Sequence, residues 1–138
     1  MAKPPLAHVL IVEDDSELLE VLQFVLEDGG YKVTVASAGE DALETIKTID
    51  DQPVDLIVLD INLKGMSGLD VARQIRAKTG AKPPLIALHT GLEEALVRKQ
   101  FSDYDLFMPK VDDADVLLKL IAGVLVAESA KAAPAASV

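Results

Sequence analysis

The sequence predicts an α/β fold, a doubly wound five-stranded parallel sheet of order 2-1-3-4-5 with helices on both faces. Three observations lead to this prediction. Short apolar runs alternate along the chain with segments in which apolar residues recur at helical spacing. The runs are nearly continuous in apolar residues, which is typical of strands buried on both faces. Right-handed crossovers between parallel strands then favour the doubly wound arrangement.

The first half of the chain predicts two pairs of a strand and a helix. His8 to Val12 is a β-branched apolar run, and the helix after it is capped by Asp15 or Ser16 and stopped by Gly29-Gly30. Tyr31 to Ala36 alternates as a strand does. The apolar positions at helical spacing are Leu18, Val21, Leu22, Val25 and Leu26 in the first helix, and Ala42, Leu43, Ile46 and Ile49 in the second.

The second half predicts three further pairs. Val54 to Leu59 is the most continuous apolar run and ends at Asp60, and a loop punctuated by glycine separates it from the next helix. Leu85 to Leu88 and Leu106 to Met108 are predicted strands, with a short helix from Glu93 to Phe101 between them. The apolar stripe is Leu69, Ala72 and Ile75 in the third helix, and Leu117, Leu120, Ile121, Val124 and Leu125 in the last.

Length places these elements in one domain, since 138 residues suit one hydrophobic core. We expect this domain to span residues 7–126, after an N-terminal extension of residues 1–6. Residues 127–138 are rich in alanine and interrupted by Pro134, which predicts a disordered tail. The last helix is apolar beyond one stripe, which predicts either a homodimer contact or extra burial in a monomer.

Composition disfavours several classes of function. The formal net charge of −10 disfavours binding to DNA or RNA. The chain contains no cysteine, which excludes thiolate metal sites and cysteine nucleophiles and fits a reducing compartment. No apolar run approaches the roughly 20 residues that span a bilayer, so we expect a cytoplasmic protein with no membrane partner.

Three acidic residues follow two strands that should be neighbours in the sheet. Glu13 and Asp14 follow the first strand and Asp60 follows the third, so all three should meet at one edge. Like charges this close call for a cation or a protonated member. Oxygen ligands favour Mg²⁺, and the fitting ligands are Asp14, Asp60 and the backbone carbonyl of Asn62. Taken alone, any one of these acidic residues is explained about as well by a role as a helix cap or solvated turn residue as by metal binding.

Four segments resemble those of a bacterial two-component receiver domain, over roughly Ala7 to Val126. The first two are specific at this separation, and the other two are weaker alone. They are LIVEDD from Leu10, VLDINLKGMSG from Val58, IALHTG from Ile86 and the single Lys110. The resemblance identifies the chain as a stand-alone response regulator with the flavodoxin-like (CheY-like) fold.

The resemblance implies a chemical role for each acidic residue. Asp60 would accept a phosphoryl group from a sensor histidine kinase, a phosphotransfer protein or a small phosphodonor. Glu13 and Asp14 would position Mg²⁺, which neutralises charge on the phosphoryl oxygens. The protein would then be no enzyme acting on a separate substrate, because it catalyses only its own phosphorylation and dephosphorylation.

The resemblance also implies that a hydroxyl group after the fourth strand and a lysine after the fifth bind the phosphoryl oxygens. Lys110 is that lysine, although the proline that usually follows it is lost and the order here is Pro109-Lys110-Val111. Alignment on Pro84 places His89 at the hydroxyl position, whereas alignment on the following glycine places Thr90 there. We favour Thr90, which can donate to phosphate. A single histidine at a strand end, such as His89 or His8, is more often a hydrogen-bonded structural residue.

The segment KVDDADVLL, aligned without gaps from Lys110, supports that lysine and places Phe107 as an aromatic switch residue. A core phenylalanine is the competing interpretation. With Thr90 and Phe107 as the switch, phosphorylation would shift a pre-existing equilibrium and change contacts with an unidentified downstream protein.

Three other functions compete with this interpretation. An aspartyl-phosphate hydrolase would need a second aspartate two residues beyond Asp60, and Asn62 stands there. A degenerate receiver-like interaction domain, independent of phosphorylation, is favoured by the altered regions around Thr90 and Lys110 but disfavoured by the intact acidic residues. A flavin-binding domain of this fold is disfavoured because few aromatic residues lie near the loops.

Overall fold

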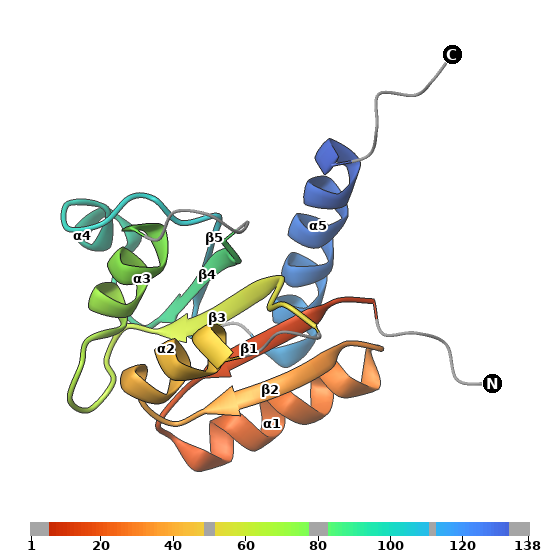
Figure 1. Cartoon of the computed structure of the whole chain (residues 1–138), viewed down its shortest axis with the longest axis horizontal. Coiled ribbons are helices and arrows are strands. Elements are labelled where there is room, and N and C mark those ends of the chain that lie inside the picture. Colours follow the sequence, from red (N-terminus) through yellow and green to blue (C-terminus); the bar gives the residue numbers. More distant parts are fainter. Residues whose placement is uncertain (1–5, 49–51, 78–82, 111–112, 133–138) are drawn as a thin grey trace.

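The computed structural model describes residues 6–48, 52–77, 83–110 and 113–132 and has a parallel sheet at its centre (Figure 1). Every strand pair is parallel, and the order is β2-β1-β3-β4-β5, which confirms the predicted fold class. The strands are β1 (His8–Val12), β2 (Lys32–Ala36), β3 (Leu56–Asp60), β4 (Leu85–Thr90) and β5 (Leu106–Pro109).

Helices cover both faces of the sheet. Helices α1 and α5 share one apolar cluster with it, and α2, α3 and α4 share the other. Each layer of helices excludes water from one face of the sheet, as the continuous apolar runs of the strands predict. The helices are α1 (Ser16–Asp28), α2 (Gly39–Thr48), α3 (Gly68–Ala77), α4 (Glu94–Arg98) and α5 (Ala114–Ala132).

Side chains alternate strictly between the two clusters along the central strands. In β3, Leu56 and Val58 belong to the cluster under α1 and α5, whereas Ile57 and Leu59 belong to the other. This is the two-residue period of a strand, and it assigns a face to every residue up to the strand end. We call the two faces the α1–α5 face and the α2–α4 face.

The ends of α1 follow from local chemistry. The side chain of Asp15 accepts hydrogen bonds from the backbone N–H groups of Glu17 and Leu18, at 3.1 and 3.2 Å, so Asp15 rather than Ser16 is the N-cap. At the other end, Gly30 has a φ of 100°, a conformation that glycine adopts without a Cβ clash. The predicted stop at Gly29-Gly30 is confirmed.

Helix α5 is longer than the sequence predicted. It continues to Ala132, beyond residue 126, and its later turns extend past the sheet in Figure 1. The prediction of a disordered tail is therefore wrong for residues 127–132, because alanine has the highest helix propensity and favours continuation of the helix. Residues 133–138 and 1–5 lie outside the described residues, as does Ile49, and the other domain bounds stay predictions. Helix α4 is shorter than the predicted range of Glu93 to Phe101.

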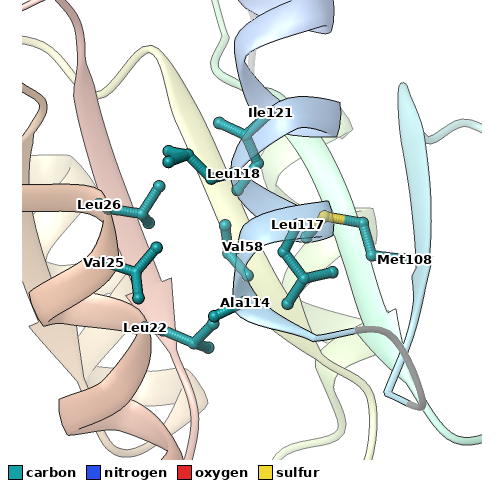
Figure 2. Close-up of a pocket in the computed structure, with 9 residues that line it drawn as sticks. All are labelled: Leu22, Val25, Leu26, Val58, Met108, Ala114, Leu117, Leu118 and Ile121. Carbon is teal, nitrogen blue, oxygen red and sulfur yellow. The ribbon is translucent and has the colours of Figure 1, made fainter. Parts of the chain in front are cut away.

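A small apolar cavity lies where α1 and α5 meet over the sheet (Figure 2). Its volume is about 10 Å³, roughly the space that one water molecule needs, and none of the described residues that line it has a polar side chain. It is therefore a packing defect and not a ligand site. The lining residues are Leu22, Val25, Leu26, Val58, Met108, Ala114, Leu117, Leu118 and Ile121.

His8 is a structural residue at the beginning of β1, as its sequence context predicted. Its ring nitrogens lie 2.7 Å from Thr34 Oγ1 and 2.8 Å from the backbone oxygen of Gln52. Its backbone N–H donates to Asp55 Oδ2 at 2.8 Å. Within the part of the chain that the structure describes, no helix is both long enough and apolar enough to cross a membrane.

Candidate functional site

Three carboxylates meet at the carboxyl ends of β1 and β3. Val12 pairs with Leu59 in register, so the next residues, Glu13 and Asp60, leave adjacent strands side by side. Glu13, Asp14 and Asp60 each offer one oxygen, and these oxygens lie within 4.8 Å of one another. Glu13 and Asp60 are each only 2% exposed, whereas Asp14 is half-buried. The predicted convergence of the three acidic residues is therefore observed.

Backbone N–H groups orient all three carboxylates. Asp60 Oδ1 accepts from the N–H of Asn62 at 3.1 Å, and Glu13 Oε1 accepts from that of Asp15 at 3.2 Å. Asp14 Oδ2 accepts from the N–H of Lys64 at 3.0 Å, which ties the loop after β3 to the loop after β1. Each carboxylate keeps a second oxygen for another partner. The role of the Asn62 carbonyl as a ligand stays a prediction.

Gly68 lets α3 begin directly against the backbone of Asp60. A Cβ at this position would lie 2.0 Å from the carbonyl oxygen of Asp60, and the N–H of Gly68 donates to the carbonyl of Ile61 at 3.0 Å. Gly65, in the same loop, has a φ of 79°. These two glycines allow the tight turn that holds Asp60 at the edge of the sheet.

Lys110 reaches the carboxylates from β5. Its Nζ lies 3.2 Å from Asp60 Oδ2 and 3.4 Å from Glu13 Oε2. The backbone N–H of Lys110 donates to the carbonyl of Thr90 at 2.9 Å, which fixes where the side chain leaves the sheet. Pro109 pairs with Thr90 on an edge strand, where a missing N–H is tolerated. The reversed order of proline and lysine therefore still leaves the ammonium at the site.

The charges of the site influence one another strongly. Burial raises the pKa of the Glu13 carboxyl above its ordinary 4.5, and the charge of Asp60 raises it further, while Lys110 partly opposes both. Burial, the largest influence on Lys110, lowers the pKa of its ammonium, but attraction to Asp60 and Glu13 outweighs it and the pKa is raised. Lys110 therefore stays charged at neutral pH, whereas the charge on Glu13 is costly.

The donor set fits a hard divalent cation. Lys110 contacts two of the three carboxylates, which leaves excess negative charge where Glu13 and Asp60 are almost fully buried. Glu13 Oε2 is buried without a hydrogen bond, and its contact with Lys110 is long for one. All the available atoms are oxygens, which Mg²⁺ prefers, and one or two carboxylates commonly hold it. The geometry is thus suitable for the predicted magnesium ion.

The two residues at the end of β4 differ in their surroundings. Asp60 pairs with His89 in register, and both His89 and Thr90 are buried. Thr90 Oγ1 accepts a hydrogen bond from the N–H of Leu92 at 3.1 Å. Thr90 thus already has a partner in the following turn, and its predicted contact with phosphate stays a prediction. The proximity of His89 to Asp60 was open in the sequence and follows from the register.

Phe107 is half-buried on β5 and packs against the cluster under α2, α3 and α4. Its ring lies 5.9 Å from that of Tyr104, centroid to centroid, with the planes tilted by 53°. Tyr104 in turn donates a hydrogen bond to Glu94 on α4. Sequence reasoning missed this link between β5 and α4, because no periodic pattern marks the loop that carries Tyr104. The switch role of Phe107 stays a prediction.

Comparison with known proteins gives a family and several relatives. A family model for the response regulator receiver domain matches residues 9–122. The uncharacterized transcriptional regulatory protein YkoG of Bacillus subtilis is 41% identical over 81 residues, which are 59% of this chain and 34% of YkoG. The DNA-binding response regulator MtrA of Mycobacterium tuberculosis is 38% identical over 81 residues, 59% of this chain and 33% of MtrA. The matched segment spans about a third of the length of these curated relatives.

Solved structures with the same fold cover most of both chains. The signal receiver domain of a putative LuxO repressor protein from Vibrio parahaemolyticus is 28% identical, with a TM-score of 0.78 over 91% of this chain and 94% of that one. The response regulator TrrA from Thermotoga maritima, solved in complex with Mg²⁺-BeF, is 31% identical, with a TM-score of 0.73 over 86% and 98%. The chain therefore belongs to the response regulator receiver domain family, whose members are signalling domains of two-component systems.

Proposed function

We propose that the protein is a receiver that accepts a phosphoryl group on Asp60 and signals through phosphorylation-dependent contacts with another protein. One observation carries the proposal. A buried carboxylate at the end of β3 lies 3.2 Å from an ammonium group and within 4.8 Å of two further carboxylates. This combines a nucleophile, a countercharge and a set of candidate cation ligands at one end of the sheet.

The chemistry is transfer of a phosphoryl group to an oxygen of Asp60. The carboxylate attacks the phosphorus of a phosphohistidine on a kinase or phosphotransfer protein, and an oxygen–phosphorus bond forms. The phosphorus–nitrogen bond breaks, and its electron pair stays on the imidazole nitrogen of the donor. The product is an aspartyl phosphate. A small acyl phosphate can serve as donor by the same step, with a carboxylate leaving.

The other residues of the site hold or balance charge. Glu13, Asp14 and Asp60 are the side chains that would hold Mg²⁺, which when bound neutralises charge on the phosphoryl oxygens. Lys110 pairs with two carboxylates before transfer and would bind a phosphoryl oxygen after it. Phosphorylation would thus draw the ammonium of Lys110 away from Glu13 and move the one side chain described here that contacts Asp60 from the end of β5.

The response would reach the surface near α4. Leu92 and Leu96, beside and on this short helix, are 42% and 52% exposed. Tyr104 connects β5 to Glu94 on the same helix. A movement of Lys110, directly after β5, would therefore change an apolar surface at α4. We propose this surface as the one that contacts the downstream protein.

The test is phosphorylation by acetyl phosphate with Mg²⁺, read as the intact mass of the protein. Wild type should gain one phosphoryl group, Asp60→Asn should gain none, and Asp70→Asn should behave as wild type. Asp70 is a suitable control because it is an exposed aspartate on α3, paired with Arg73. If neither acetyl phosphate nor a phosphorylated kinase labels wild type at Asp60, the phosphorylation-independent interaction domain becomes the better function.

A further inference from the structure

His89 lies on β4, between the strand that ends at Asp60 and the strand that precedes Lys110. It pairs in register with Asp60 on β3 and with Met108 on β5. Residues paired in register on parallel strands have Cα atoms roughly 4.8 Å apart and side chains on the same face. The side chain of His89 therefore leaves the sheet beside that of Asp60.

The alternation of side chains assigns His89 to the face of the acidic site. In β4, Ala87 belongs to the cluster under α1 and α5, and Leu88 belongs to the other. His89, two residues after Ala87, lies on the α1–α5 face, as Asp60 does two residues after Val58. Thr90 follows Leu88 to the α2–α4 face, where its hydroxyl accepts from the N–H of Leu92.

Lys110 extends over the same part of the sheet. It lies two residues after Met108, which belongs to the α1–α5 cluster, and its Nζ contacts Asp60 on β3. Strand β4 lies between β3 and β5, so the lysine side chain crosses the end of β4 on the face of His89. His89 is only 2% exposed, so its imidazole lies within the protein and not in solvent.

From this geometry we propose that the imidazole of His89, rather than the hydroxyl of Thr90, donates a hydrogen bond to the phosphoryl group on Asp60. The inference rests on the proposed function of Asp60. A neutral imidazole carries one N–H donor, and a phosphoryl group brings oxygen acceptors into the pocket. A hydrogen bond to a charged oxygen that is shielded from water is among the stronger ones. His89 is then a binding residue for the phosphorylated state.

The first measurement uses the two histidines of the chain as probe and internal control. The 138-residue chain, labelled with ¹⁵N-histidine, is titrated with beryllofluoride in the presence of Mg²⁺. The ring N–H resonance of His89 should shift and show coupling to fluorine, while that of His8, at the other end of the sheet, should not change. His8→Asn assigns the two signals.

A set of variants measures the contribution of the imidazole. His89→Leu, of similar volume, should weaken beryllofluoride binding roughly tenfold or more, because one hydrogen bond to a charged group is lost. His89→Gln keeps an N–H donor and should restore part of the affinity. Thr90→Val, which removes only the hydroxyl, should weaken binding less than His89→Leu does. Folding of each variant is checked from its amide spectrum.

Three outcomes overturn the inference. An unchanged His89 resonance while an Asp60-dependent beryllofluoride complex forms would exclude contact with the imidazole and leave the function of Asp60 intact. A larger loss for Thr90→Val than for His89→Leu would assign the contact to the hydroxyl. Absence of any Asp60-dependent complex or phosphoryl adduct in wild type would overturn the proposed function, and the inference with it.

Discussion

The two ends of the parallel sheet treat buried polar groups in opposite ways. At the amino end, both ring nitrogens of His8 have partners within 2.8 Å, and the backbone N–H of His8 donates to the side chain of Asp55. At the carboxyl end, Glu13 and Asp60 are equally buried but share a single ammonium, that of Lys110. The hydrogen bonds of His8 at the amino end are complete within the fold, whereas the carboxylates at the carboxyl end keep an excess of negative charge.

This difference separates a structural role from a functional one. A polar group whose hydrogen bonds are complete contributes to stability and needs no ligand. A pocket with excess negative charge costs stability, and binding of a cation relieves that cost. Burial alone therefore does not mark a functional residue, and position at the carboxyl ends of the strands does. Three predictions test how far this contrast extends.

The largest effect is expected from Gly68→Ala at the carboxyl end. The new Cβ would lie 2.0 Å from the carbonyl oxygen of Asp60, and backbone atoms must move to admit it. We expect a loss of about 3 kcal/mol or more in the free energy of unfolding, measured by urea denaturation. Gly123→Ala is the matched change on α5, where a Cβ meets nothing within 4 Å.

Gly123→Ala should raise the free energy of unfolding by about 0.5–1 kcal/mol, because alanine is a better helix former than glycine. Similar losses for both variants would mean that the close approach at Asp60 has no special cost. A stable Gly68→Ala variant with normal phosphorylation would show that the loop after β3 can move to admit the Cβ. The backbone around Asp60 would then not be held rigidly by this close approach.

The second prediction separates the countercharge from the metal ligands. Lys110→Met keeps the length of the side chain and removes its charge, so phosphorylation by acetyl phosphate should slow roughly tenfold or more. The affinity for Mg²⁺, measured by calorimetry, should stay equal or rise, because a cation no longer competes for Asp60 and Glu13. Lys64→Met is the control, since the Lys64 side chain is exposed in the neighbouring loop. Equal losses of phosphorylation and Mg²⁺ affinity in Lys110→Met would contradict the assigned role.

The smallest effect concerns pH and Glu13 in the metal-free protein. Its pKa is raised by burial and by Asp60, so the folded state binds a proton more tightly than the unfolded state does. The associated stability is present below about pH 4.5 and is lost as pH rises through the raised pKa. Glu13→Gln cannot ionise, so its free energy of unfolding should fall less with pH over this range and exceed that of wild type at pH 7.

Asp55→Ala supplies the comparison at the amino end, because alanine removes the acceptor that asparagine would keep. The carboxylate of Asp55 accepts a hydrogen bond from the backbone of His8, so its replacement should lower stability at pH 7, where Glu13→Gln raises it. Thermal unfolding with and without Mg²⁺ measures both. If Glu13→Gln is less stable than wild type without metal at pH 7, the charged carboxylate of Glu13 does not lower the free energy of unfolding, contrary to the direction of its pKa shift.

Much of the fold could be predicted because its signals are local. Strand runs, helical stripes and the acidic cap at Asp15 depend on residues within a few positions of one another, and they indicated every strand and helix. Their bounds were less accurate, and the end of α5 was wrong. The alanine-rich segment after residue 126 has a composition common in disordered tails, but its helix propensity decided the structure up to Ala132.

The site was predictable where it depended on the order of the strands alone. An acidic residue that follows each of two neighbouring parallel strands must lie at their shared edge, so Glu13, Asp14 and Asp60 could be grouped in advance. The reach of Lys110 could not be derived in this way, because it depends on how β5 sits beside β4. The alignments also left His89 and Thr90 as alternatives.

The sequence by itself determined the layers, the order of the strands and the acidic character of one edge of the sheet. Only the tertiary structure decided that the ammonium of Lys110 contacts Asp60 and that His89, not Thr90, shares the face of Asp60. The physical reason is the two-residue period of strands, in which a change of one residue in register moves a side chain to the opposite face. That register is set by contacts between distant segments, which local sequence patterns do not contain.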